Sequence, residues 1–365
     1  MSETPSRSRH ALFQLMLSLG LVAGLFMAAG PGSTAGMADE TPGDDTRASG
    51  IDPETDAARL EPWWPSPWGA EDERGNMNLL TPEKVLEAAA LIETGKLYDL
   101  GREFDDKMPL MNLPPNPRKF TSVSVHAPLN QPVGRNALVW NDDYVSGHIT
   151  QDGTQFDSLA HMATHLGEKG DKRDLRYYNG FRHSDIAGPY GFSKLGVEKV
   201  TPIFTRGVLL DFAGLKGRMI EIEEEITVAD IRAALERQGL SEDDIRAGDA
   251  LFYNTGWGEL WKVDNDKFNS GSPGLSDKAG DWVVARQVVL VGTDNWSVEA
   301  IPNPEDPELF APNHQKFLIR HGIHIMENMD FTPLIEDETY VFAFSFAPIA
   351  IKGATGSPAR PFAIR

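Results

Sequence analysis

Short apolar runs, some of them alternating with polar residues, recur along the chain from residue 120 onward and predict β-strands. Each run is too short for a typical helix and is flanked by turn-forming residues. In chain order the predicted strands are Phe120–His126, Ala137–Tyr144, Gly207–Phe212, Ala250–Asn254, Val288–Gly292 and Thr339–Pro348. The pattern therefore predicts a protein whose core is built mainly from a sheet.

Three segments have the start and stop signals of helices, with a capping residue or proline at the start and a glycine at the end. The first runs from the cap Thr81 through Pro82 to Gly95, the second from Thr227 to Gln238 before Gly239, and the third from Asn313 to His321 between Pro312 and Gly322. Strands outnumber helices and do not alternate regularly with them. We therefore expect an α/β fold with a mixed, barrel-like sheet and few flanking helices.

The stretch from 153 to 161 is the most chemically diverse part of the chain. If it is extended, Gln155, Asp157 and His161 share one face and Phe156 lies on the other, because side chains alternate along a strand. Such a face suits a divalent cation beside a proton-transfer group. A polar turn next to a core histidine would give the same sequence, and the residues alone leave both interpretations open.

A second polar position lies near the C-terminal end of an apolar segment. If this segment is a strand, Glu327 shares a side with Ile323 and Ile325. A carboxylate buried on that side is costly unless a cation or a hydrogen-bond donor compensates it. The alternative is that Met326 faces the core and Glu327 faces solvent.

The first of these segments resembles the signature of the cyclase family, which includes bacterial kynurenine formamidase, isatin hydrolase and trans-dienelactone hydrolase. The usual signature reads H-x-G-T-H-x-D-x-x-x-H, and this chain has its glycine, threonine, aspartate and last histidine at Gly153, Thr154, Asp157 and His161. Gln151 and Gln155 stand where the family has two histidines, and Gln155 matches the G-T-Q-x-D variant of the dienelactone hydrolase branch. These substitutions exclude a bis-histidine metal site.

Further segments extend the resemblance along much of the chain. They are the late His314, Glu327 and Asn328, the blocks Asn254–Trp257 and Gly292–Asp294, and the passage 72–80 before the first helix. The resemblance implies the family's swivelling β/β/α fold and a divalent metal bound by Gln155, His314 and Glu327, with Asp157 binding or bridging. Zinc is the expected ion and manganese the alternative, because oxygen ligands with one imidazole suit both.

The activity implied by the resemblance is hydrolysis of a small cyclic ester or amide, or of an N-formyl amide, by metal-activated water. His161 would act as general acid and base. Thr154 or a backbone amide would help to hold the oxyanion. Other residues could support the metal or the substrate: His148, Gln151, His165, Trp63, Trp64 and Trp257. For Trp63 and Trp64, stapling of the N-terminal arm to the body is the favoured interpretation and a ligand cleft the alternative. His126, His183, His321 and His324 are expected to be packing or surface residues.

The N-terminal region predicts export. Residues 1–38 combine Arg7 and Arg9, an apolar run and a small-residue exit, as secretory signal peptides do. A membrane anchor is the alternative, but the small-residue exit favours cleavage. Residues 39–60 read as a flexible acidic leader, which leaves 61–365 as a single cyclase-like hydrolase domain. We expect a periplasmic or secreted protein with no stable membrane anchor after cleavage.

Composition narrows the remaining function classes. The net charge of −20 argues against binding to nucleic acid. The chain has no cysteine, which excludes a thiolate nucleophile, and it has no G-x-S-x-G elbow, P-loop or dinucleotide fingerprint. We expect a small-molecule substrate and, from the resemblance, a homo-oligomer. The rival hypothesis is a secreted binding protein that has lost catalysis and holds its ligand in a tryptophan-lined cleft.

Overall fold

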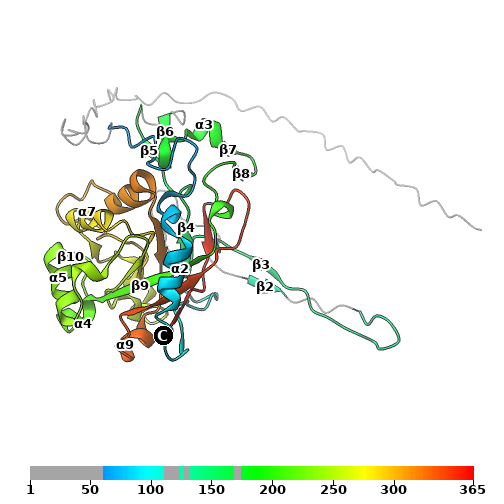
Figure 1. The fold of residues 1–365 in the computed structure, drawn as a ribbon. Coiled ribbons are helices and arrows are strands. Elements are labelled where there is room, and N and C mark those ends of the chain that lie inside the picture. The colour runs from blue at the N-terminus through cyan, green and yellow to red at the C-terminus, as the bar shows by residue number, and fades with distance from the viewer. Residues whose placement is uncertain (1–60, 111–123, 127–130, 168–173) are drawn as a thin grey trace, which may run out of the picture. The chain divides into compact units, whose positions relative to one another are not determined.

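The computed structural model describes residues 61–110, 124–126, 131–167 and 174–365 (Figure 1). These residues belong to one compact unit that spans Asp52–Arg365. The predicted signal peptide and acidic leader lie outside the described residues, as does the first part of the predicted strand Phe120–His126.

A curled nine-stranded sheet forms the body, with the strand order β1-β17-β15-β9-β11-β13-β14-β4-β16. In that order the strands are Leu97–Asp99, Phe362–Ile364, Val341–Phe346, Ile203–Asp211, Ala250–Asn254, Leu290–Thr293, His324–Glu327, Gln155–Asp157 and Gly356–Pro358. The four strands β9, β11, β13 and β14 are parallel, and the pairings on either side of them are antiparallel. The mixed, barrel-like sheet expected from the sequence is therefore present.

Two-stranded ribbons and short helices surround this sheet. The ribbons pair β2 (Ser124–His126) with β3 (Tyr144–Ser146), β5 (Thr164–His165) with β6 (Leu175–Arg176), β7 (Ala187–Gly188) with β8 (Gly191–Phe192), and β10 (Glu225–Ile226) with β12 (Gly274–Leu275). The α-helices are α2 (Pro82–Ala89), α3 (His183–Ile186), α4 (Phe212–Lys216), α5 (Val228–Arg237), α6 (Asn265–Asn269), α7 (Asp277–Ala285), α8 (Pro312–His314) and α9 (Thr332–Glu336). The π-helix η7 (Gln315–His321) continues α8 directly, and 3₁₀ turns cover Gly75–Leu79, Tyr178–Gly180, Val197–Lys199, Glu242–Asp244 and Trp257–Leu260.

Both faces of the parallel strands are buried, which explains why their sequences read as continuous apolar runs. In β9, Val208 and Leu210 belong to the cluster packed under α5 and α7, whereas Leu209 belongs to the cluster on the other face. Phe252 of β11 lies in that second cluster against Phe344, with ring centroids 4.7 Å apart. The sheet therefore has one hydrophobic core packed against each of its two faces.

The second predicted helix is confirmed as α5. Thr227 caps it, and the capping box is complete because Asp230 accepts from the backbone N–H of Thr227. The third is confirmed as α8 with η7, although most of its length is π-helical. The first helix starts at Pro82 as predicted but ends at Ala89 instead of reaching Gly95.

The early end of α2 has a tertiary cause. The backbone N–H groups of Thr94, Gly95 and Lys96 all donate to the carbonyl oxygen of Arg365. The chain is thereby drawn toward β1, which pairs with β17 near the C-terminus. Capping and turn residues near α2 cannot reveal a contact with Arg365, so the sequence pattern did not predict where this helix ends.

The predicted strand Ala137–Tyr144 is wrong for most of its length. Val133 and Leu138 exchange backbone hydrogen bonds across a tight turn, and Ala137 in that turn has a positive φ of 52°. The strand β3 begins only at Tyr144. Apolar residues at a turn gave the same alternation as a strand, so the pattern was misleading.

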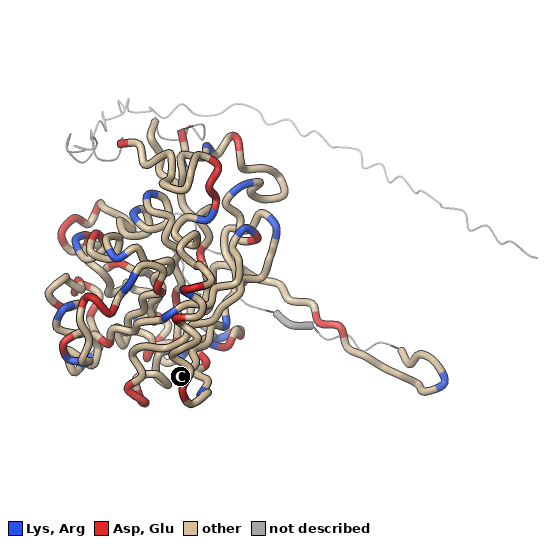
Figure 2. The backbone as a smooth tube through the Cα atoms, viewed as in Figure 1, with Lys and Arg blue, Asp and Glu red and all other residues tan. Residues whose placement is uncertain are grey.

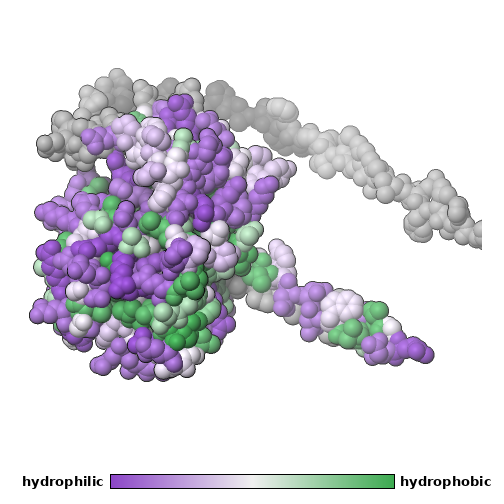
Figure 3. All heavy atoms as spheres, viewed as in Figure 1, coloured by the Kyte–Doolittle hydropathy of each residue, from purple (hydrophilic) through white to green (hydrophobic). Residues whose placement is uncertain are grey.

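Charged and apolar groups have different places on the surface. Figure 2 shows Lys, Arg, Asp and Glu mostly in the helices and loops around the sheet. The face in Figure 3 is mainly hydrophilic, with apolar groups gathered in its lower half. Val85 and Leu86 of α2 are among the exposed apolar residues. Within the described ranges, no helix has both the length and the apolar character needed to span a membrane.

Candidate metal centre

Strands β4 and β14 bring the two polar segments of the sequence together. They pair antiparallel, so that Gln155 lies opposite Glu327 and Phe156 lies opposite Met326. Alternation along each strand puts the carboxamide and the carboxylate on one face. Phe156 and Met326 pack into the cluster on the other face. Glu327 is 2% exposed, so the hypothesis that it faces solvent is wrong.

The extended segment is shorter than the sequence suggested. Strand β4 ends at Asp157, and the next residues turn, with the N–H of His161 donating to the carbonyl oxygen of Ser158. Ser158 leaves the ladder because its N–H donates to Thr355. His161 therefore approaches the site from a turn and not from the strand face that carries Asp157.

A third element completes the cluster. His314, at the end of α8, points its Nε2 toward Glu327 Oε1 at 3.3 Å. Asp157, His314 and Glu327 each offer a ligand atom, and these atoms all lie within 4.8 Å of one another. All three side chains are buried. The fold thus gathers an imidazole and two carboxylates from three separate elements.

Several oxygen atoms in this cluster are buried without a hydrogen-bond partner. They are Gln155 Oε1, both carboxylate oxygens of Asp157, and Glu327 Oε1, which makes the 3.3 Å ionic contact with His314 Nε2 but no hydrogen bond. Leaving buried acceptors unpaired is expensive, and for a charged carboxylate it is more so. A divalent cation compensates all of them at once, and two carboxylates balance its charge. The donor set therefore fits a metal ion.

The pKa shifts of Glu327 and His314 also indicate that the cluster favours a cation. Burial raises the pKa of Glu327 to about 7, assisted by the nearby charges of Asp157 and Glu299 and opposed by His314. Burial also disfavours the charged form of His314, but the carboxylates of Glu299 and Glu327 outweigh it and raise the pKa of His314 well above its ordinary value. Negative charge is concentrated here, so a cation is favoured.

Glu299 is a member of the site that the sequence analysis missed. It is 1% exposed and accepts two hydrogen bonds from His314, one from the backbone N–H at 2.8 Å and one from Nδ1 at 2.7 Å. It lies in the loop after β13, outside any motif that we recognised. No local pattern marks it, because its partner is fifteen residues away on another element.

A small cavity, here called the mouth, borders Gln155. Its volume is about 10 Å³, and it is lined by Pro109, Gln151, Asp152, Gly153, Gln155, Phe268, Asn269, Trp296 and Asn328. Asn328 donates from Nδ2 to the carbonyl oxygen of Gly153, which fixes the orientation of its carboxamide. Phe268 and Trp296 supply apolar walls, and neither was singled out in the sequence.

A comparison of the sequence with models of known protein families shows to which family this chain belongs. The model of the Cyclase family, described as "Putative cyclase", matches residues 98–300, more than half of the chain. This chain belongs to the cyclase family. None of the curated proteins matches it.

Solved structures share the cyclase fold with this chain. A crystal structure described as a novel cyclase is 28% identical, has a TM-score of 0.68, and covers 82% of this chain and 98% of its own. Isatin hydrolase A from Ralstonia solanacearum is 20% identical with a TM-score of 0.51, covering 78% and 98%. Isatin hydrolase A from Labrenzia aggregata, bound to benzyl benzoate, is 20% identical with a TM-score of 0.52, covering 76% and 94%.

Two of the family blocks meet around one carboxylate. Asp294 accepts from the N–H and hydroxyl of Thr255 at 2.9 and 2.7 Å, and from the N–H of Gly258 at 3.0 Å. This side chain therefore ties the turn after β11 to the end of β13. None of the three residues of the metal cluster belongs to these two blocks.

His161 and Thr154 differ in what their side chains can do. His161 Nε2 lies 3.9 Å from Asp157 Oδ2, and its side chain is 21% exposed. An imidazole in this position can reach both the cluster and solvent. Thr154 is fully buried, and its hydroxyl donates to the carbonyl oxygen of Asn328 and accepts from the N–H of Arg102, each at 2.8 Å. That hydroxyl has no hydrogen left for an oxyanion.

The tryptophans singled out in the sequence make packing contacts in the structure, and Trp63 also lines a pocket of about 490 Å³ with Trp68. Trp257 is fully buried, and its Nε1 donates to the carbonyl oxygen of Phe268. Trp63 packs edge-on against Trp64 and donates from Nε1 to the carbonyl oxygen of Tyr177. These contacts agree with a staple for the N-terminal arm, and none of the three lines the mouth.

The remaining sequence candidates lie around the site in different ways. Gln151 lines the mouth, and its N–H donates to the carbonyl oxygen of His148. His165 belongs to β5, where it pairs with Leu175. Within the described part of the chain, the group of candidate metal-binding histidine and acidic residues consists of Asp157, His314 and Glu327 and does not include His148 or His165.

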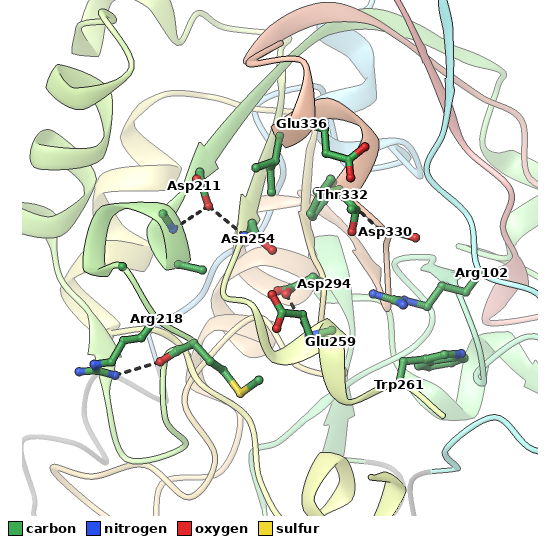
Figure 4. A pocket seen from close by; sticks show the side chains of 17 residues that line it. Arg102, Asp211, Arg218, Asn254, Glu259, Trp261, Asp294, Asp330, Thr332 and Glu336 are labelled. Atoms are coloured by element: carbon green, nitrogen blue, oxygen red, sulfur yellow. Dashed lines mark hydrogen bonds between the residues drawn. The ribbon is translucent and has the colours of Figure 1, made fainter. Parts of the chain in front are cut away.

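A larger pocket opens at the carboxyl ends of β9, β11 and β13 (Figure 4). Its volume is about 560 Å³, and Asp211, Asn254 and Asp294 lie at the strand ends that border it. These side chains are satisfied by neighbours: Asn254 donates to Asp211, and Asp294 holds the turn described above. The pocket contains no residue of the metal cluster.

Proposed function

We propose that this cyclase-family protein is a metal-dependent hydrolase that opens a small cyclic ester or amide or cleaves an N-formyl amide. The observation that carries the proposal is the group of buried, unpaired oxygen atoms on Gln155, Asp157 and Glu327 around His314. Family membership and the fold shared with isatin hydrolases support it.

The ligands would be Gln155 Oε1, the carboxylates of Asp157 and Glu327, and His314 Nε2. One nitrogen and three oxygen donors suit zinc or manganese. We expect zinc to bind more tightly, because the affinity of a given site rises from manganese to zinc. Manganese remains the alternative because the donors are mainly oxygen.

A divalent cation at this position supplies Lewis acidity, which lowers the pKa of water and polarises a carbonyl group. His161 would accept the proton released from water and deliver it to the leaving oxygen or nitrogen. Its approach from a turn gives it access to both the cluster and solvent. Phe268 and Trp296 would exclude water from one side of the substrate.

The direct test is metal analysis of the purified protein together with hydrolysis of a lactone, a cyclic amide and an N-formyl aromatic amine. We expect about one divalent ion per chain, loss of hydrolysis with a chelator, and recovery with zinc or manganese. Glu327→Gln should lose both metal and activity, whereas Glu83→Gln, an exposed carboxylate on α2, should lose neither. Full hydrolysis by metal-free protein would overturn the proposal. Bound metal without turnover of any of the three substrates would instead favour a binding protein.

We also propose that the protein is exported and acts as a homo-oligomer on a small molecule. Export rests on the pattern of residues 1–38, and an exported protein does not need disulfides. Mass spectrometry of protein from the periplasm and medium would identify the mature N-terminus. Light scattering would give the assembly state, and a cytoplasmic, uncleaved monomer would contradict both parts.

A further inference from the structure

Glu299 stands on the opposite side of the His314 ring from the other carboxylates. The Nδ1 of His314 contacts Glu299, whereas its Nε2 faces Glu327. We propose that Glu299 is a positioning residue that fixes the orientation and tautomer of His314 so that Nε2 is presented as a metal ligand. This inference rests on the proposed metal centre.

The two carboxylate oxygens of Glu299 bind two different atoms of the same residue. Oε2 accepts from the backbone N–H of His314 and Oε1 from its Nδ1, at 2.8 and 2.7 Å. The hydroxyl of Ser297 also donates to Oε1. A carboxylate that holds both the backbone and the ring leaves the imidazole little rotational freedom, so it orients Nε2 before the metal binds.

The same contacts decide which nitrogen carries a proton. An ionised carboxylate can only accept hydrogen bonds, so Nδ1 must be protonated beside it. The backbone N–H of His314 can only donate, and it donates to Oε2, while the hydroxyl of Ser297 donates to Oε1, so both oxygens of Glu299 act as acceptors. With the proton held on Nδ1, the lone pair of the neutral ring is on Nε2, where Asp157 and Glu327 converge.

Replacing Glu299 with glutamine should reverse this arrangement. The backbone N–H of His314 cannot change its role, so the amide oxygen must stay with it. The amide NH₂ then faces Nδ1 and donates to it, which moves the ring proton to Nε2. A protonated Nε2 cannot bind a metal. Size and packing are almost unchanged, so the loss would come from hydrogen-bond polarity.

The test is zinc affinity, measured by competition with a chromogenic chelator, for the wild type, Glu299→Gln, Glu299→Asp and Ser297→Ala. We expect zinc to bind E299Q about 10- to 100-fold more weakly than wild type. E299D keeps two acceptor oxygens, so its zinc affinity should lie between those of wild type and E299Q. S297A removes a neighbouring donor but leaves both His314 bonds, so its affinity should stay within a few-fold of wild type.

Thermal unfolding of the metal-free variants separates positioning from folding. A positioning role predicts that added zinc raises the melting temperature of wild type and S297A more than that of E299Q. If E299Q melts earlier without metal but binds zinc as tightly as wild type, Glu299 is only structural and the inference fails. Should E299Q not fold, equal affinities of E299D and wild type would overturn it. Absence of zinc binding by the wild type would instead overturn the proposed metal centre itself.

Discussion

Gln155 Nε2 donates a hydrogen bond to Glu327 Oε2 at 2.9 Å, directly across the β4–β14 ladder. The carboxamide occupies a position where the cyclase signature has a histidine. Its nitrogen orients the carboxylate, and its oxygen is buried without a hydrogen-bond partner. Glutamine at this position therefore holds a neighbouring carboxylate with its nitrogen and leaves its own oxygen available to a cation.

Gln155→His should change the metal preference. The variant replaces an oxygen donor with a nitrogen donor and loses the bond to Glu327. Because imidazole favours zinc over manganese, we expect the ratio of zinc to manganese affinity to rise by about one order of magnitude. Calorimetric titration with each ion would measure it, with Gln238→His as a control outside the site. An unchanged ratio would mean that Gln155 is not a ligand.

His161→Ala should separate metal binding from turnover. We expect bound metal close to wild type and a kcat lower by about 10²- to 10⁴-fold, the usual contribution of a general acid and base. His183→Ala is a suitable control, because that imidazole bonds to Tyr177 outside the cluster. Equal loss of metal and activity in the His161 variant would show that His161 is a ligand and not the proton-transfer group.

Metal binding should release protons, and its affinity should rise with pH. Glu327, whose pKa is raised to about 7, and His314, whose pKa is raised well above its ordinary value, must both be deprotonated at the atoms that bind. We expect up to two protons released per ion near pH 6. Calorimetry in buffers of different ionisation enthalpy would count them. A heat independent of the buffer would contradict the assignment of these ligands.

The free energy of unfolding of the metal-free protein should depend on pH through the titration of Glu327. Its folded pKa of about 7 lies above the value of 4.5 for a free glutamate, so the native state holds a proton that the unfolded state releases. Its contribution to stability is therefore lost as pH rises from about 4.5 to 7, by about 3 kcal/mol. Urea unfolding across this window should show a steeper decline for wild type than for Glu327→Gln. Parallel profiles would argue against a protonated Glu327.

Thr154→Val should destabilise the fold more than it affects chemistry. The hydroxyl joins the N–H of Arg102 to the carbonyl oxygen of Asn328, and valine leaves both unpaired in a buried place. We expect a loss of about 1–3 kcal/mol in the free energy of unfolding. Thr154→Ser should recover most of it. If the valine variant instead keeps its stability and loses kcat, the hydroxyl acts on the substrate.

Hydrophobic patterns and capping residues in the sequence were sufficient to predict several strands and helices. The strand Ala250–Asn254 was predicted to the residue, and the Thr227 cap defined the start of its helix. Capping and turn preferences act over a few residues, so they can be read without the fold. The cyclase signature likewise identified Asp157 and its surroundings, because a short motif keeps its own residues together.

Contacts between segments far apart in the sequence decided how the residues of the site are arranged. Only the pairing of β4 with β14 sets Gln155 against Glu327, and only the approach of the loop after β13 to α8 sets Glu299 against His314. The sequence by itself therefore determined which side chains could bind a metal and which class of fold would carry them. The tertiary structure decided which oxygens and nitrogens converge, since hydrogen-bond geometry between distant segments depends on how the whole sheet is packed.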